Sequence, residues 1–246
     1  MNQLGEYLDI SEVNEMRRVE NTDDLVPVNN VVITVFDKSN LDLLVPRLVR
    51  INPEVMIYST GGTYKRLLEI LGGDAERNVQ EVSKYTGQPE TEGGLVKTLH
   101  HKLFLGYLTE TYCEAHQTDL EREGAKPIDM FVGNLYPFQK VVAGPEIDIE
   151  DARMNIDVGG PSALRAAAKN WHRVTTVADP SDYEALIKEI EEYDGCTTLK
   201  TRFELHKKVY RVLAEYNKAI ADFVEGVPFK HVEGIYGISN RRNDHK

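Results

Sequence analysis

The sequence predicts an α/β protein built on a doubly wound, mainly parallel sheet flanked by helices, with a helical extension at the C-terminus. Short runs of β-branched and other apolar residues, typical of buried strands, alternate with longer runs that have helical periodicity. This alternation predicts a parallel sheet with helices on both faces. Polar turns follow several of the apolar runs, at the sheet edge where such folds bind ligands.

The predicted elements follow one another through the middle of the chain. Strands are expected at 31–36, 55–57, 79–82, 128–132 and 174–178, and helices at 41–49, 64–71, 105–112, 149–156, 163–170 and 183–192. The charged segment 117–126 is expected at the surface, and helical spacing continues from 195 to about 224. We divide the chain into an N-terminal extension (1–26), an α/β domain (27–194) and a C-terminal helical extension with a tail (195–246).

Composition argues against several classes of protein. The formal net charge is −11 over 246 residues, whereas general nucleic-acid binding needs clustered Lys and Arg. No apolar run is long enough to span a membrane, and the N-terminus has no apolar signal core. Cys113 and Cys196 are expected to be free thiols in a reducing compartment, which favours the cytoplasm. His100 and His101 are adjacent rather than four apart, so no metal site is predicted.

The turn at residues 59–63 has the pattern of a phosphate-binding cradle, because two glycines join a predicted strand to a predicted helix. Glycines let the backbone approach an anion, and free N–H groups at the helix start point toward it. Thr60 and Thr63 can add hydroxyl donors. Lys38, just after the first strand, can pair with the phosphate. An ordinary N-cap and a solvated lysine would explain the same residues.

Four further side chains can take part in chemistry, and each also has a structural explanation. Lys97 lies in a glycine-flanked loop, where a lysine can transfer a proton or bind substrate. Asp157 precedes two glycines and can be a helix cap. Lys169 ends an alanine-rich helix, where a cation favours the dipole. Tyr136 lies in a turn, where tyrosine usually packs with its hydroxyl in water. Asp157 and Lys169 would lie about three helical turns apart and can flank one ligand.

Six segments, in this order, together resemble a known family: TVFDKS (34–39), STGGT (59–63), VKTLH (96–100), NLYPF (134–138), NIDVGGP (155–161) and LRAAAKN (164–170). They resemble the IMP cyclohydrolase domain at the N-terminus of the bifunctional purine-biosynthesis enzyme AICAR transformylase/IMP cyclohydrolase. The resemblance runs from about 31 to 192 and continues more weakly to about 224. It implies the methylglyoxal-synthase-like fold.

The resemblance implies that 5-formamidoimidazole-4-carboxamide ribotide closes to IMP with loss of water, without cofactor or metal. The implied catalytic residues are Lys97, Tyr136, Asp157 and Lys169. The implied substrate- and phosphate-binding residues are Thr34, Lys38, Ser59, Thr60, Gly61, Gly62, Thr63, Thr98, Asn134, Gly159 and Gly160. The expected partner is the purine ribotide, in a homo-oligomer that binds neither nucleic acid nor membrane.

The sequence departs from the family pattern at several positions. Phe36 stands where the family usually has Ser, and Leu95 where it has Arg. Losing the arginine removes a bidentate anion contact that a lysine does not replace. The loop at 86–94 is long enough to suggest a function.

The departures keep other interpretations open. One is a catalytically silent purine-nucleotide sensor, or a subunit for a separate transformylase. Another is phosphate elimination of the methylglyoxal-synthase kind. No region resembling the transformylase domain follows before Lys246, so a separate formyltransferase polypeptide is expected.

Overall fold

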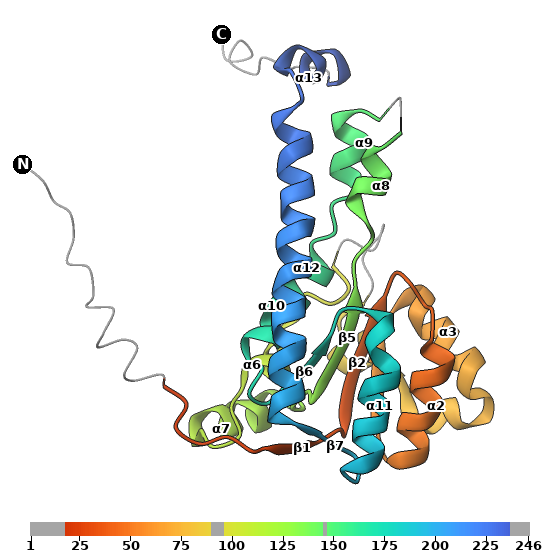
Figure 1. The fold of residues 1–246 in the computed structure, drawn as a ribbon, viewed down its shortest axis with the longest axis vertical. Helices are drawn as coiled ribbons and strands as arrows, with labels where there is room; N and C mark the ends of the chain where they lie inside the picture. Colours follow the sequence, from red (N-terminus) through yellow and green to blue (C-terminus); the bar gives the residue numbers. More distant parts are fainter. Residues whose placement is uncertain (1–17, 90–95, 145–146, 237–246) are drawn as a thin grey trace, which may run out of the picture.

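A five-stranded sheet forms the centre of the molecule (Figure 1). The computed structural model describes residues 18–89, 96–144 and 147–236. The strands run in the order β4-β3-β2-β5-β6, and every neighbouring pair is parallel. Their bounds are β2 Asn30–Val35, β3 Met56–Ser59, β4 Val79–Glu81, β5 Met130–Asn134 and β6 Thr175–Val177. The predicted strands are therefore confirmed, with ends shifted by one or two residues.

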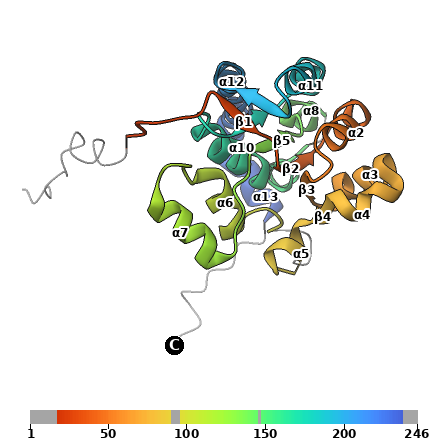
Figure 2. The same cartoon turned by 90° about the horizontal axis from the view of Figure 1, so that it is seen from below.

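Helices cover both faces of this sheet, which confirms the doubly wound arrangement (Figures 1 and 2). On one face, side chains such as Val31 and Ile33 pack against helices α2, α3 and α11. On the other, Val32 and Phe131 pack against α6, α10 and α12. Successive strand residues point to opposite faces, so one strand contributes to both cores. The bounds are α2 Leu41–Ile51, α3 Gly61–Leu71, α6 His101–Leu108, α10 Gly159–Lys169, α11 Tyr183–Glu192 and α12 Leu199–Glu225.

Several elements differ from the expectation. Helix α6 occupies His101–Leu108 rather than 105–112, because the His100 side chain accepts a hydrogen bond from the Lys102 N–H and caps the helix there. The charged surface segment contains helix α7, Glu114–Glu123. Strands β1 (Leu25–Pro27) and β7 (Cys196–Thr198), which pair in antiparallel fashion, were not predicted. The shorter helices are α4 Ala75–Asn78, α5 Val82–Thr86, α8 Phe138–Val142, α9 Ile149–Met154 and α13 Phe229–Ile235.

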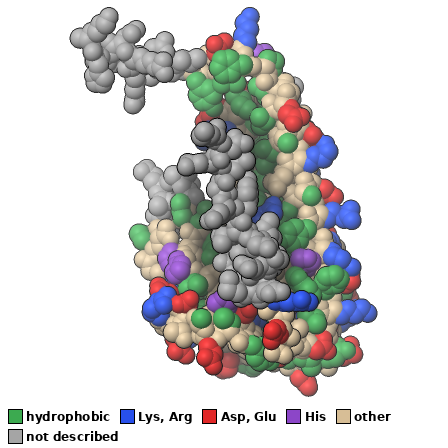
Figure 3. Space-filling model, turned by 90° about the vertical axis from the view of Figure 1, so that its left-hand side faces the viewer, with side chains coloured by type: hydrophobic (Ala, Val, Ile, Leu, Met, Phe, Trp, Pro, Cys, Tyr) green, Lys and Arg blue, Asp and Glu red, His purple; other side chains and the backbone are tan. Residues whose placement is uncertain are grey.

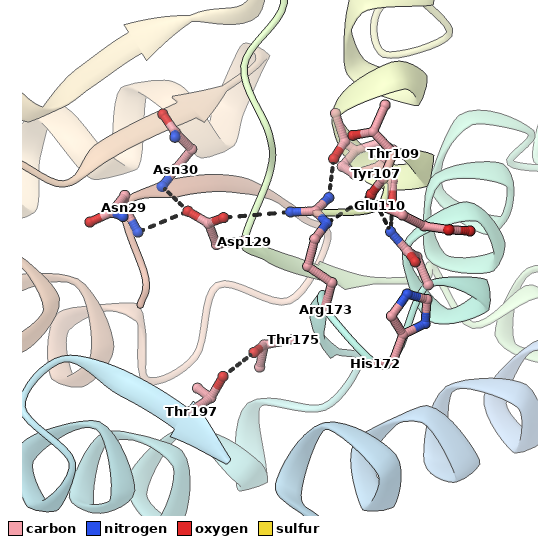
Figure 4. A network of polar contacts seen from close by, with 12 residues as sticks. Asn29, Asn30, Tyr107, Thr109, Glu110, Asp129, His172, Arg173, Thr175 and Thr197 are labelled. Carbon is pink, nitrogen blue, oxygen red and sulfur yellow. Dashed lines mark hydrogen bonds and ion pairs between the residues drawn. The ribbon is translucent and has the colours of Figure 1, made fainter. Parts of the chain in front are cut away.

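A buried ion pair lies at the end of the sheet where the strands begin (Figure 4). Asp129 lies just before β5. Its carboxylate accepts hydrogen bonds from the N–H groups of Asn29 at 3.0 Å and of Asn30, the first residue of β2, at 2.8 Å. Its carboxylate lies 3.6 Å from the guanidinium of Arg173, which also donates to the carbonyl oxygens of Gly106 and Thr109. Burial raises the pKa of Asp129, against the effect of Arg173, and lowers that of Arg173. This network ties β2, β5 and α6 together.

Helix α12 extends well beyond the sheet, with α8, α9 and α13 around its far end (Figure 1). Tyr216 and Phe223 of α12 pack edge-on against Phe138 of α8, with ring centroids 6.4 and 6.0 Å apart. Figure 3 shows hydrophobic side chains gathered on this projection. Phe229 and Met154 are 69% and 63% exposed there. Helix α13 lies in the region expected to be a tail.

Candidate active site

The predicted phosphate cradle lies where β3 turns into α3, at the carboxyl end of the sheet. Gly61 has a φ of +51°, which favours glycine. A Cβ atom built on Gly61 would lie 3.6 Å from the Lys97 ammonium nitrogen, and one on Gly62 would lie 3.9 Å from that of Lys38. The first N–H groups of a helix have no intrahelical partner, and α3 has no acidic residue in its first turn. Two ammonium groups and a helix start therefore converge, as an anion site requires.

Two of the hydroxyls assigned to this cradle are used elsewhere. Ser59 is fully buried and donates to the Ile33 carbonyl oxygen at 2.6 Å. Thr63 is buried and donates to the carbonyl of Val35 at 3.0 Å, while accepting from the Val35 N–H at 3.2 Å. The Thr63 hydroxyl thus joins α3 to the end of β2, and its assignment to a phosphate stays a prediction. Backbone N–H groups and lysines remain as the anion donors.

Asn134 has a supporting place beside the cradle. Its amide nitrogen donates to the Asp37 carbonyl, and its amide oxygen accepts from the Asp37 N–H, both at 2.8 Å. These bonds fix the backbone of Asp37, the residue before Lys38. The Asn134 side chain therefore positions the loop that carries this lysine. Thr34 lies opposite Gly133 across the β2–β5 register, and Thr60 is the extended residue just before α3.

A second glycine pair begins α10 and faces the same loop. A Cβ atom on Gly159 would lie 2.9 Å from the Thr98 hydroxyl, so the two segments are in close contact. Asp157 accepts a hydrogen bond from the Gly160 N–H at 3.1 Å, and a Cβ atom on Gly160 would overlap its carboxylate. Asp157 therefore does act as a cap. The Lys97–Thr98 segment thus lies between two glycine-rich helix starts and links the Asp157 turn to the predicted cradle.

Tyr136 lies next to this turn. It lines a cavity of about 310 Å³, whose other residues are Phe36, Met154, Asn155, Ile156 and Asp157. The rings of Tyr136 and Phe36 meet edge-on with centroids 4.3 Å apart, and Phe36 is 53% exposed. The aromatic ring that replaces the expected serine therefore contacts one of the predicted catalytic residues.

Asp157 and Lys169 line a second cavity, of about 540 Å³, between α10 and α12. Lys169 ends α10, and helical side chains tilt toward the helix N-terminus, which is the end where Asp157 lies. Arg165, one turn earlier, lines the same cavity. Within the described part of the chain, neither cation has a hydrogen-bond or ion-pair partner. Asp157 and Lys169 therefore line one space, and that they flank one ligand there stays a prediction.

Helix α12 contributes a residue that was not predicted. The Tyr216 hydroxyl accepts a hydrogen bond from the Asp157 N–H at 2.7 Å, and the ring lines the cavity between the two helices. In the sequence, Tyr216 occupies one of the apolar positions of an amphipathic helix. Nothing in the sequence therefore indicated a place for it in the site. Burial raises the pKa of its phenol.

Several observations outside the site concern the predictions about cavities, metal ions, cysteines and membrane spans. A cavity of about 810 Å³ is lined in part by residues 18–23 and includes Lys169 as its one residue from the predicted site. Among the described residues, no group of three or more His, Cys, Asp or Glu side chains could hold a metal ion. Cys113 and Cys196 are free, as expected. No described helix is long and apolar enough to cross a membrane. Leu95 and positions 90–94 of the loop at 86–94 lie outside the described residues.

Comparison with known proteins gives consistent matches. The family model of the MGS-like domain matches residues 43–162, and that of the AICARFT/IMPCHase bienzyme matches 167–243. The bifunctional purine biosynthesis proteins PurH of Acidithiobacillus ferrooxidans and Bacillus subtilis are each 40% identical over 200 residues, or 81% of this chain. The chain spans 37% and 38% of their lengths. A solved structure, titled as the crystal structure of ForH, is 30% identical with a TM-score of 0.66, covering 80% of this chain and 98% of that one.

Proposed function

Because this chain belongs to the MGS-like family that includes the IMP cyclohydrolase region of the PurH proteins, we propose that it closes 5-formamidoimidazole-4-carboxamide ribotide to IMP. The observation that carries this proposal is the position of the Lys97–Thr98 segment. It contacts a phosphate-type helix start on one side and the Asp157 turn on the other. One small anionic substrate could therefore contact both.

The substrate's 5′-phosphate would lie at the N-terminus of α3, between Lys38 and Lys97. Backbone N–H groups and ammonium groups are the donors that bind phosphate best. The base would then extend toward Tyr136 and Asp157. Holding the carboxamide against the formyl group supplies much of the rate, because well-oriented intramolecular reactions reach effective molarities of about 10⁵–10⁸ M.

Ring closure requires two proton movements. The carboxamide nitrogen attacks the formyl carbon, a C–N bond forms, and the nitrogen loses its proton. The formyl oxygen takes up that proton and a second one from the formamide N–H, and it leaves as water as the C–O bond breaks and a C=N bond forms at the formamide nitrogen. Lys169 with Asp157 would handle the carboxamide proton, while Lys97 and Tyr136 would stabilise the formyl oxygen. These groups suffice for the chemistry without a cofactor or metal.

The assay that tests this function measures conversion of the formylated ribotide to IMP by the purified protein. The Lys169→Ala variant should lose turnover by about 10²-fold or more, the usual size of a general acid–base contribution. It should still bind IMP in calorimetry. Lys230→Ala, on the exposed helix α13, is the matched control and should match the wild type. A fully active Lys169→Ala variant would contradict the assigned role.

A catalytically silent nucleotide sensor is the second candidate, and the exposed Phe36 ring against Tyr136 favours it. In the same assay, a sensor would bind IMP without forming it above a no-enzyme blank.

The homo-oligomer and the separate formyltransferase stay predictions. Light scattering would test the first, and co-purification would test the second. Exposed apolar side chains on the projection, such as Phe229 and Met154, support the first of them.

A further inference from the structure

Helix α12 lines the cavity of Asp157 and Lys169 with Tyr216, Asn217 and Ile220, and the Tyr216 hydroxyl bonds directly to the Asp157 turn. Tyr216 lies 59 residues after Asp157 in the sequence, yet its oxygen accepts the Asp157 N–H at 2.7 Å. Tyr216 is 5% exposed, and the bond itself is part-buried beside the cavity that both residues line. Phe138 packs edge-on against its ring and fixes the ring's position. The hydroxyl therefore occupies a defined point beside the Asp157 turn.

The turn is held from two directions. On one side the Asp157 carboxylate accepts the N–H of Gly160 at the start of α10. On the other, the backbone N–H of the same aspartate donates to α12. An N–H that is left without an acceptor inside a protein costs up to about 1–3 kcal/mol, so the turn would shift to recover a partner. Such a shift would move the carboxylate relative to Lys169, which lines the same cavity.

We propose that Tyr216 is a positioning residue for ring closure, acting through Asp157. This inference rests on the proposed function, since Asp157 is a catalytic group only in that reaction. The role belongs to the phenolic oxygen, and the ring supplies packing. Removing the oxygen alone should therefore impair the chemical step more than it impairs folding or ribotide binding.

The test compares Tyr216→Phe with Tyr210→Phe. Tyr210 lies on the same helix, is half-buried, and has no hydrogen-bond partner for its hydroxyl in the described part of the chain. For Tyr216→Phe we expect kcat to fall by about tenfold or more and KM to change less than about threefold, because small displacements of catalytic groups act on the reacting geometry. Tyr210→Phe should retain wild-type constants.

Amide hydrogen exchange at Asp157, followed by NMR, gives a readout independent of turnover. Loss of the acceptor should speed exchange of this amide by about five- to tenfold, as expected for one net hydrogen bond. The control variant should leave it unchanged. An unchanged rate in Tyr216→Phe would overturn the inference. So would wild-type kcat, and so would an unfolded variant, which would mean that the hydroxyl supports the fold instead.

The two proposals fail in different ways. An inactive wild type would remove the proposed function. The exchange measurement would then still decide whether Tyr216 fixes the Asp157 turn. An active wild type with an unaffected Tyr216→Phe variant would leave the function standing and remove only the positioning role.

Discussion

Gly160 shows how a residue without a side chain can define a catalytic position. A Cβ atom there would overlap the Asp157 carboxylate and lie 2.9 Å from Cδ2 of Leu135. Both neighbours are held in place, because Asp157 is bonded to the turn and Leu135 packs against buried residues. Only a residue without a Cβ atom leaves room for the Asp157 carboxylate at the start of α10, so glycine is required at this position.

Substitution Gly160→Ala should displace Asp157 and reduce kcat/KM by about 10²-fold, a typical cost of misplacing a reacting group by about 1 Å. Steady-state kinetics on the ribotide would measure this. Gly234→Ala, in α13, is the matched control, since nothing lies within 4 Å of its added Cβ atom. Equal kinetics for the two variants would show that the Asp157 position does not matter to the reaction.

The sequence predicted residue types at the site better than their roles. Lys38 and Lys97 follow the motifs, and the structure brings both to the cradle. Ser59 and Thr63 also follow the motifs, but their hydroxyls satisfy carbonyl groups at strand ends. A sequence does not show which hydroxyls the backbone will use, because that depends on the pairing of distant strands. Tyr216 was missed for the same reason: its partner is 59 residues away.

At the scale of elements, the five strands of the central sheet and the long helices were predicted well, whereas the strands outside that sheet were missed. Helix α11 has the predicted bounds, because Asp179 caps the turn before it by accepting the N–H of Ser181. Strands β1 and β7 have three residues each and form a separate two-stranded sheet, in which each pairs with the other. Their pairing is tertiary information that local propensity does not contain.

The Asp129–Arg173 pair links elements at the end of the sheet opposite the site, so its loss should affect stability first. Asp129→Ala would leave a buried guanidinium unpaired, which costs about 3–5 kcal/mol. Asp129→Asn should cost less, because it keeps an acceptor for the N–H groups of Asn29 and Asn30. Urea denaturation would measure both.

Asp119→Ala is the control for that experiment, since its partner Arg122 is exposed. An exposed pair contributes at most about 1 kcal/mol. If the Asp129 and Asp119 variants were equally stable, the buried pair would not be holding β2 to β5.

The whole molecule should become less stable as the pH falls below the ordinary range of histidine. Burial, the largest cause, lowers the pKa of His172, and the nearby cations of Arg173 and Arg202 act in the same direction. Burial also lowers the pKa of His100. A pKa below the unfolded value, about 6.5, means that the unfolded chain binds the proton more readily. The free energy of unfolding should therefore decrease as the pH falls through about 6.5.

Urea unfolding at pH 7.5 and 5.5 checks this in the wild type, His172→Asn and His231→Asn. Removing His172 should make the loss of stability between the two pH values smaller. His231 is exposed, so its replacement should leave the loss unchanged. An identical loss in all three proteins would show that His172 does not contribute.

The β1–β7 ribbon joins segments from nearly opposite ends of the described chain, and Arg202 fastens it. This fully buried side chain donates to the carbonyl oxygens of Asp23, Asp24, Thr197 and His172. Asp24 and Leu199, which also bond to each other, are 175 residues apart. A ribosome that adds about 5–20 residues per second needs roughly 9–35 seconds to cover that distance. During synthesis β1 therefore has no partner strand until β7 has been made. The β1–β7 pairing is accordingly a late step in folding.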